Sequence, residues 1–249
     1  MMTDLEKYYN KFDEDHRLTT RHGQVEFTTT MKYIHDFLGH TPDDAPRTIL
    51  DVGAGTGRYS IALAQEGHHV TAVELVDRNR KVMESKHANV NIWPGNAMDL
   101  HFLPDAKFDI TLLFGPLYHL HSHEERLKAF AEARRVTKPG GIIFAAYTMN
   151  EYSIITYCFK ENHINECVAD KSITADFHTI ESPSQLYTYF RLEDIDRLNK
   201  DAGLTRIKIF AADGPADYLR QTLNAMDDEA FNHFMEYHLA TCERTDLLG

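Results

Sequence analysis

The sequence has few cysteines and no long apolar run. Its three cysteines, Cys158, Cys167 and Cys242, are odd in number, and none is spaced as C-x-x-C. This favours free thiols in a reducing compartment over a disulfide framework or a zinc site. No segment approaches the ~18 apolar residues that a membrane span needs, and the charged N-terminus lacks the apolar core of a signal peptide. We therefore expect a cytoplasmic protein that is not inserted in a membrane.

Positive charge is also scarce. The 249 residues include 26 Lys and Arg against 38 Asp and Glu, which gives a formal net charge of −12. No cluster of Lys or Arg offsets this balance, so the electrostatic footprint of a nucleic-acid-binding protein is missing. Internal repeats and low-complexity linkers are absent as well. The length therefore predicts one large α/β domain with small additions rather than two full domains.

Apolar segments of strand length alternate with amphipathic segments through most of the chain. Two helices are predicted before this alternation starts, over 4–14 and 24–38. The predicted strands are 48–52, 69–75, 89–94, 108–114, 140–147 and 205–212, and the helices among them are 57–67, 78–87, 123–136 and 191–203. Strands separated by spacers of helix length imply βαβ crossovers. The sequence therefore predicts an α/β fold with a Rossmann-like, doubly wound and mostly parallel sheet.

Two segments fall outside this alternation. Residues 148–190 are rich in aromatic side chains, and residues 216–246 favour two further helices with a capping aspartate in MDDEA (226–230). No antiparallel seventh strand is evident before Gly249. We expect a single domain with four parts: an N-terminal helical cap over 1–45, a core over 46–147, an inserted helical lid over 148–190 and a C-terminal part over 191–249.

A glycine-rich turn follows the first predicted strand, in the sequence ILDVGAGTGRY (49–59). Glycine lets a ligand approach the backbone, and the helix that follows directs its first N–H groups at an anionic group. A phosphate-binding P-loop needs a lysine after its last glycine, and none follows Gly57. A dinucleotide turn needs its third glycine at the position of Arg58. The turn instead fits the pattern D-x-G-x-G-x-G, with Asp51, Gly53, Gly55 and Gly57.

This turn and the motifs after it resemble the class I S-adenosylmethionine-dependent methyltransferase family, in its small-molecule branch similar to ubiquinone and menaquinone methyltransferases. The resemblance covers residues 45–147 and, more loosely, 190–212. Glu74 ends the second strand as an acid does in the family, and GNAMDL (95–100) resembles the family's G-D-A-x-x-L segment. Asn96 stands where the family most often has Asp.

The resemblance implies S-adenosylmethionine as the cofactor, with Glu74 receiving its ribose hydroxyls. Arg17 and Arg21, with Tyr8 and Tyr9, are expected to close over the donor, an arginine meeting its carboxylate. A solvated helix face is the alternative for these four residues, and Asp51 has the alternative of ordering its own loop. The other residues expected at the cofactor site are Asp51, Gly53, Ala54, Gly55, Gly57, Tyr59, Leu75, Asn96, Ala97, Met98, Phe114 and Gly115.

The loop after the fourth strand, FGPLYHL (114–120), bears on the substrate. Family members that methylate base amines commonly carry [NDS]-P-P-[FYW] there, and this loop lacks it. Together with the acidic charge, this favours a small-molecule acceptor over nucleic acid. His119 is a candidate general base and Tyr118 a candidate for positioning the acceptor, with loop packing as the alternative for both. The HLHSH run (119–123) has no Cys or acid at ligand spacing, so no metal site is predicted.

The predicted activity is transfer of a methyl group from S-adenosylmethionine to a small molecule. Two alternatives stay open: an NAD(P)-dependent oxidoreductase, and a protein that binds S-adenosylmethionine without catalysis. The methyl donor is already activated, so alignment, exclusion of water and removal of a proton are the tasks left to the enzyme. We expect a monomer or a homodimer.

Overall fold

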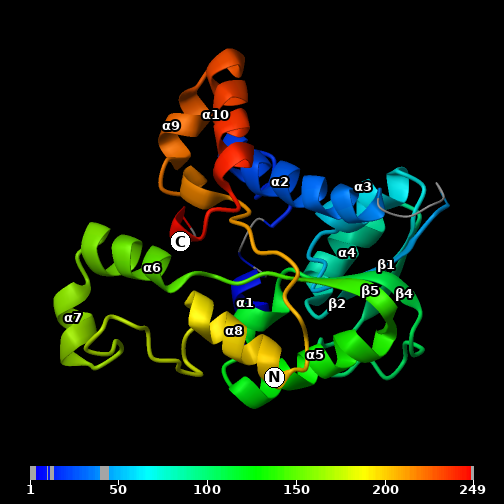
Figure 1. The fold of residues 1–249 in the computed structure, drawn as a ribbon, viewed down its shortest axis with the longest axis horizontal. Helices are drawn as coiled ribbons and strands as arrows, with labels where there is room; N and C mark the ends of the chain where they lie inside the picture. Colours follow the sequence, from blue (N-terminus) through cyan, green and yellow to red (C-terminus); the bar gives the residue numbers. More distant parts are fainter. Residues whose placement is uncertain (1–3, 10, 12–13, 40–44, 248–249) are drawn as a thin grey trace. The chain divides into compact units, whose positions relative to one another are not determined.

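A computed structural model describes residues 4–9, 11, 14–39 and 45–247 of the chain (Figure 1). The chain divides into two compact units. The first comprises Met1–Asp15, His35–Tyr147 and Pro183–Tyr187, and the second comprises His16–Ile34, Thr148–Ser182 and Thr188–Gly249. The division into a cap, a core, a lid and a C-terminal part stays a prediction.

A five-stranded parallel sheet forms the centre of the first unit. Its strands are β1 Thr48–Val52, β2 His69–Glu74, β3 Val90–Pro94, β4 Phe108–Leu113 and β5 Thr137–Ala145. The strand order is β3-β2-β1-β4-β5, and each neighbouring pair is parallel. Strand β1 is central, because Ile49 pairs with Val70 on one side and with Ile110 on the other. The predicted Rossmann-like sheet is confirmed.

Three helices of this unit cross between the strands, namely α3 Arg58–Gln65, α4 Asp77–Ser85 and α5 His123–Val136. Figure 1 shows α3 and α4 on one side of the sheet and α5 on the other. Helix α5 begins at a capping box, in which the Ser122 hydroxyl accepts from the Glu125 N–H and the Glu125 carboxylate accepts from the Ser122 N–H. Just beyond α3, Gly67 has a φ of +97°, a left-handed conformation that commonly ends a helix.

The core of the first unit lies along its two central strands. Ile49 and Leu50 of β1 and Leu112 and Leu113 of β4 are fully buried, and Phe130 packs into the core from α5. Strands covered on both faces need near-continuous apolar side chains, which is why TILDV and FDITLL form them. Each such side chain stabilises the fold by roughly 1.5–3 kcal/mol through its burial.

The N-terminal helices differ in length from those predicted. Helix α1 is Asp4–Tyr9, so it is shorter than 4–14, and residues 10, 12 and 13 lie outside the described part of the chain. Helix α2 is Arg21–Leu38 and begins three residues earlier than predicted. Its residues Val25 and Ile34 are fully buried.

The second unit is mainly helical. Besides most of α2 it contains α6 Asn150–Ser153, the π-helix η2 Ile154–Lys160, α7 Ile164–Ala169, α8 Leu192–Asp201, the 3-10 turn η3 Gly214–Ala216, α9 Arg220–Ala225, α10 Asp228–Thr241 and the 3-10 turn η4 Thr245–Leu247. Val25, Ala216, Leu223 and Phe231 pack together as one of its apolar clusters. Asp227 caps α10 by accepting a 2.8 Å hydrogen bond from the Ala230 N–H, which confirms the predicted capping aspartate.

The predicted strand over 205–212 is wrong. These residues have no regular secondary structure, and β5 is an edge of the sheet among the described residues. The Phe210 ring stacks on Tyr33 of α2 at 3.8 Å, and the Ala211 N–H donates to the Cys242 carbonyl at 2.8 Å. Ile207 is 65% exposed. Packing on helices therefore buries part of the apolar surface of this segment, and the segment forms no β-ladder.

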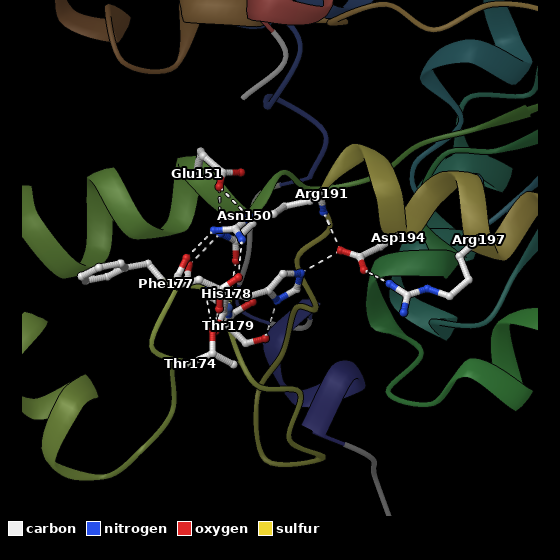
Figure 2. A network of polar contacts seen from close by, with 10 residues as sticks. Asn150, Glu151, Thr174, Phe177, His178, Thr179, Arg191, Asp194 and Arg197 are labelled. Carbon is white, nitrogen blue, oxygen red and sulfur yellow. Dashed lines mark hydrogen bonds and ion pairs between the residues drawn. The ribbon is translucent and has the colours of Figure 1, made fainter.

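A polar network joins the insertion to the start of α8 (Figure 2). Asp194, the third residue of α8, accepts from the Arg191 N–H at 2.9 Å and lies 2.7 Å from Nε2 of His178. It also contacts the guanidinium of Arg197. Nδ1 of His178 lies 3.0 Å from the Thr179 carbonyl, so both ring nitrogens face acceptors. Burial works to lower the pKa of His178, but the bonds to Asp194 and to the carbonyl raise it overall.

Asn150 holds a strained residue within this network. Its Nδ2 donates to the Phe177 carbonyl at 2.9 Å, and its Oδ1 accepts from the Thr179 N–H at 2.9 Å. Phe177 has a φ of +61°, a conformation that is rare for a bulky residue and costs about 1–3 kcal/mol. The fully buried Asn150 therefore fixes the backbone that follows Phe177, on both sides of His178. The lid function of 148–190 stays a prediction.

Candidate active site

The glycine turn lies at the carboxyl end of the central strand β1. Gly53, Gly55 and Gly57 have φ values of +75°, +57° and +86°, which side chains other than glycine rarely adopt. The N–H groups of Gly53 and Ala54 both donate to the Val73 carbonyl, at 2.8 and 3.2 Å. These bonds hold the turn against β2 at the sheet edge where open α/β folds bind their ligands.

Glu74 ends β2 beside this turn. Its side chain is 5% exposed, and its Oε2 and Oε1 accept hydrogen bonds of 2.7 Å from the N–H groups of Gly55 and Val76. Burial raises the pKa of Glu74 to about 7, against the effect of these two bonds, and the charges of Asp51 and Glu14 add to the increase. Each carboxylate oxygen keeps a further lone pair, so the group can still accept from two hydroxyls of a ligand.

The three glycines differ in what surrounds them. A Cβ at Gly53 would lie 2.9 Å from Cδ of Pro116, and one at Gly57 would lie 2.6 Å from Cγ of Met83. Both positions therefore need glycine for packing as well as for φ. A Cβ at Gly55 would meet its nearest atom, Cγ of Glu14, at 3.4 Å, which is an ordinary contact. Gly55 thus has the most room beside it.

Asp51 and Tyr59 point into the protein. Asp51 is 2% exposed, and its Oδ2 accepts a 2.6 Å hydrogen bond from the Ser60 hydroxyl at the start of α3. Burial raises the pKa of Asp51 to about 6, although the bonds from Ser60 lower it. The Tyr59 ring is buried and meets Phe114 edge-on at 5.0 Å. These contacts favour the alternative that Asp51 orders its own loop.

The segment predicted to lie beside the adenine follows β3. The Gly95 N–H donates to the Glu74 carbonyl at 3.3 Å, which brings this segment to the end of β2. Asn96 uses its side chain within the turn, where Oδ1 accepts from the Met98 N–H at 3.0 Å. Ala97 is buried, whereas Leu75 is 42% exposed next to Glu74.

The loop after β4 packs on the glycine turn. A Cβ at Gly115 would lie 3.4 Å from the Gly53 carbonyl oxygen, and Pro116 contacts Gly53 as described above. Pro116 begins the 3-10 turn η1 (Pro116–His119), which buries Leu117. The Tyr118 hydroxyl donates to the Phe114 carbonyl at 2.8 Å. Gly115 thus lies against Gly53, and Phe114 precedes it in the same loop.

His119 makes two hydrogen bonds to residues far from it in the sequence. Its Nδ1 lies 2.8 Å from the Leu186 carbonyl, and its Nε2 lies 3.0 Å from the Tyr9 hydroxyl. Burial lowers the pKa of His119 to about 4. The Tyr187 ring lies 5.0 Å from the imidazole. Leu186 and Tyr187 were missed because they come from a loop far along the chain with no motif of its own.

Arg17 and Arg21 belong to the second unit. Arg17 makes two contacts with the Glu26 carboxylate, at 2.6 and 3.1 Å, and Arg21 pairs with Asp228 at 2.7 Å. Their place at the donor stays a prediction. Among the residues that the structure describes, no three His, Cys, Asp or Glu side chains converge as metal ligands. Within that same part of the chain, no helix has both the length and the apolar character to cross a bilayer.

Comparison with known proteins identifies the part of the chain that holds this site. Residues 50–145 match the family model described as a methyltransferase domain. The chain carries a class I S-adenosylmethionine-dependent methyltransferase domain. Over 133 residues it is 32% identical to a demethylmenaquinone methyltransferase of Lysinibacillus sphaericus, a match that covers 51% of this chain and 55% of the relative.

Other relatives share the same domain. A cypemycin N-terminal methyltransferase of Streptomyces sp is 35% identical over 108 residues, covering 42% of this chain and 43% of that protein. The chain thus spans about half the length of the curated relatives that it matches.

Solved structures agree on the fold. The PH0226 protein of Pyrococcus horikoshii OT3 superposes with a TM-score of 0.56 at 19% identity, covering 78% of this chain and 88% of that one. An S-adenosylmethionine-dependent methyltransferase of Methanosarcina mazei gives a TM-score of 0.53 at 20% identity, covering 68% and 82%. The residues of the methyltransferase domain fit its cofactor, because a buried carboxylate with spare lone pairs adjoins a turn that is open at Gly55.

Proposed function

We propose that this protein transfers a methyl group from S-adenosylmethionine to a small-molecule acceptor. The observation that carries the proposal is the buried carboxylate of Glu74, bonded to the Gly55 N–H at the edge of the sheet where the methyltransferase domain would hold its donor. The names of the two relatives give different acceptors, a quinone and the N-terminus of cypemycin. They therefore support the reaction class and leave the acceptor of this chain open.

The donor would be held by three segments of the first unit. Glu74 would accept from the two ribose hydroxyls, and the turn at Gly53, Ala54 and Gly55 would allow the donor to lie against the backbone. Leu75, exposed beside Glu74, and the segment of Asn96, Ala97 and Met98 would flank the adenine. Phe114 and Gly115, which pack on the turn, would lie nearest the methyl group.

The bound donor supplies a methyl group activated by a sulfonium. An acceptor atom would take this methyl group with its lone pair, and the electron pair of the C–S bond would stay with sulfur. The positive charge of the sulfonium disappears in this step, so the chain's main tasks are alignment and exclusion of water. The buried, aromatic surroundings of Tyr59 and Phe114 support the second task.

The setting of the reaction is part of the proposal. A formal net charge of −12 supports a small molecule over nucleic acid as the acceptor, because phosphate backbones are bound through Lys and Arg. The three cysteines are all free thiols, which supports a reducing, cytoplasmic location. We propose a monomer or a homodimer.

Isothermal calorimetry with S-adenosylhomocysteine tests donor binding directly. We expect a one-site isotherm with the wild type and no binding of NADH. The reverse result would favour the oxidoreductase alternative. Metabolite extracts incubated with methyl-labelled S-adenosylmethionine should then yield a labelled product that mass spectrometry can identify. Donor binding without any labelled product would favour a non-catalytic binding protein.

A further inference from the structure

We propose that Glu14 is a specificity-determining residue of the donor site, and that its carboxylate favours the positively charged sulfonium donor over the neutral thioether product. This inference rests on the proposed methyl transfer and concerns the same site. It adds a residue of the N-terminal segment to the residues of the strands and the glycine turn. Its role would be to help the site exchange its product for fresh donor.

Glu14 lies beside the glycine turn, within the first unit. Its Cγ and Oε1 are 3.4 and 3.6 Å from the position that a Cβ of Gly55 would take, and the three atoms nearest to that position all belong to Glu14. The N–H of Gly55 donates to Oε2 of Glu74 at 2.7 Å. Gly55, against which the donor would lie, therefore contacts two acidic side chains.

An ion pair links this part of the N-terminal segment to the turn. Nζ of Lys86 pairs with the carboxylate of Asp15, the residue after Glu14. The same Nζ donates to the carbonyl of Thr56, the residue after Gly55, at 2.9 Å. One ammonium group thus joins the neighbours of Glu14 and Gly55, and it keeps the half-buried Glu14 beside the turn.

The charge of Glu14 acts on the donor site. Burial raises the pKa of Glu74, and the charges of Asp51 and Glu14 raise it further. The Glu14 carboxylate therefore influences the group that would hold the ribose, whatever its other contacts. The proposed preference depends on this charge and not on an open hydrogen-bonding atom, because coulombic interaction acts across a distance.

Donor and product differ in a feature that a carboxylate distinguishes. S-adenosylmethionine carries a positive sulfonium where S-adenosylhomocysteine carries a neutral thioether, and the two molecules are otherwise alike except for the methyl group. A nearby negative charge therefore stabilises the bound donor more than the bound product. At an effective dielectric constant of about 20, two unit charges about 12 Å apart still change an equilibrium about tenfold, so direct contact is not required.

Isothermal calorimetry with both ligands at low ionic strength tests the preference without any acceptor. The ratio of the affinity for S-adenosylmethionine to that for S-adenosylhomocysteine isolates the response to charge. We expect this ratio to fall about tenfold in Glu14→Gln, with the S-adenosylhomocysteine affinity within about twofold of wild type. Glu14→Asp keeps the charge and should retain most of the wild-type ratio.

Glu124→Gln is the matched control, because it removes the same charge from a side chain of α5 that is 78% exposed. Its ratio should equal that of the wild type. An unchanged ratio in Glu14→Gln would show that Glu14 only packs on the turn, and tighter binding of both ligands would show that it occupies the place of the donor. Either result overturns the proposed preference. Failure of the wild type to bind S-adenosylhomocysteine would instead remove the proposed function.

Discussion

The backbone N–H of Gly55 lies 2.7 Å from Oε2 of Glu74, so the glycine turn and the end of β2 are held as one unit. The second oxygen of the same carboxylate accepts from Val76, which starts the connection to α4. One side chain therefore orders two backbone segments and still offers lone pairs to a ligand. Substitution of Glu74 should therefore change the affinity for the donor more than it changes the structure of the rest of the sheet.

Glu74→Ala should weaken S-adenosylhomocysteine binding more than Glu74→Gln. Alanine removes both acceptors, whereas glutamine keeps one carbonyl oxygen. Loss of hydrogen bonds to a charged group should cost about 1.5–3 kcal/mol in the alanine variant. Calorimetry on the wild type and both variants measures this order. Equal and negligible effects would show that the ribose is bound elsewhere.

Donor affinity should decrease as the pH falls from 8 to 6. The pKa of Glu74 is raised to about 7, so the carboxyl group takes up a proton in this range and one oxygen stops accepting. Titrations of S-adenosylhomocysteine at several pH values should show this dependence in the wild type and a flat profile in Glu74→Gln. A wild-type affinity that is independent of pH would contradict it.

The same raised pKa has an opposite effect on folding. Glu74 titrates near its ordinary value of 4.5 in the unfolded chain and near 7 in the folded one, so the native state binds the proton more tightly. Its contribution to stability is therefore lost as the pH rises through about 7. Denaturant unfolding at pH 6 and 8 should show a smaller difference in Glu74→Gln than in the wild type.

Gly57→Ala should destabilise the protein more than Gly67→Ala. Both glycines have positive φ, at +86° and +97°, but only the Cβ at position 57 would meet a neighbour, Cγ of Met83 at 2.6 Å. Strain alone costs about 1–3 kcal/mol in each variant, and overpacking adds a comparable amount at position 57. In denaturant unfolding, Gly57→Ala with Met83→Ala should recover the overpacking part if the contact is its cause.

The contact between His178 and Asp194 should stabilise the insertion only within a window of pH. The raised pKa of His178 means that its contribution is present below about 6.5 and lost as the pH rises through the higher folded value. The pKa of Asp194 is lowered in the folded protein, so the contribution also disappears as the pH falls through this lowered pKa of Asp194. As the pH rises, amide exchange of residues 174–179 should accelerate by more than the intrinsic exchange rate does. His178→Gln should remove this additional acceleration.

The segment 148–190 should exchange its amide hydrogens faster without ligand than with S-adenosylhomocysteine. Ligand-binding segments are drawn from the less stable parts of a structure. Mass spectrometry of exchanged peptides, with β1 as an internal reference, gives the comparison. Uniform protection of the segment in the absence of ligand would identify a rigid cap instead of a lid.

Local sequence signals predicted most of the first unit. Strand β1 was predicted over 48–52 as it is found, because a central parallel strand is a short run of apolar residues. Helix α5 was predicted over 123–136 and is found there, and the structure shows that a capping box of Ser122 and Glu125 begins it. The segment 205–212 has the same apolar character as a strand, and only tertiary packing on Tyr33 distinguishes it from one.

The residues predicted to hold the donor and the contacts of His119 differ in the same way. Gly53, Gly55 and Glu74 lie within one strand–turn–helix–strand motif, so the family resemblance predicted them from positions close in sequence. Tyr9 and His119 are 110 positions apart, and His119 and Leu186 are 67 apart. No periodicity links such positions. Their pairing depends on how three segments distant in sequence meet in the folded chain, which no local sequence pattern encodes.

The position of β1 between β2 and β4 also determines when the glycine turn can form during folding. Ile49 must find Val70 and then Ile110, and each parallel pairing closes a loop before it gains any energy. Gly53 gets its neighbour Pro116 only after β4 has joined the sheet. The chain therefore has to emerge from the ribosome beyond residue 116 before the glycine turn acquires its final shape. Nascent chains that have emerged less far than this should not retain the methyl donor.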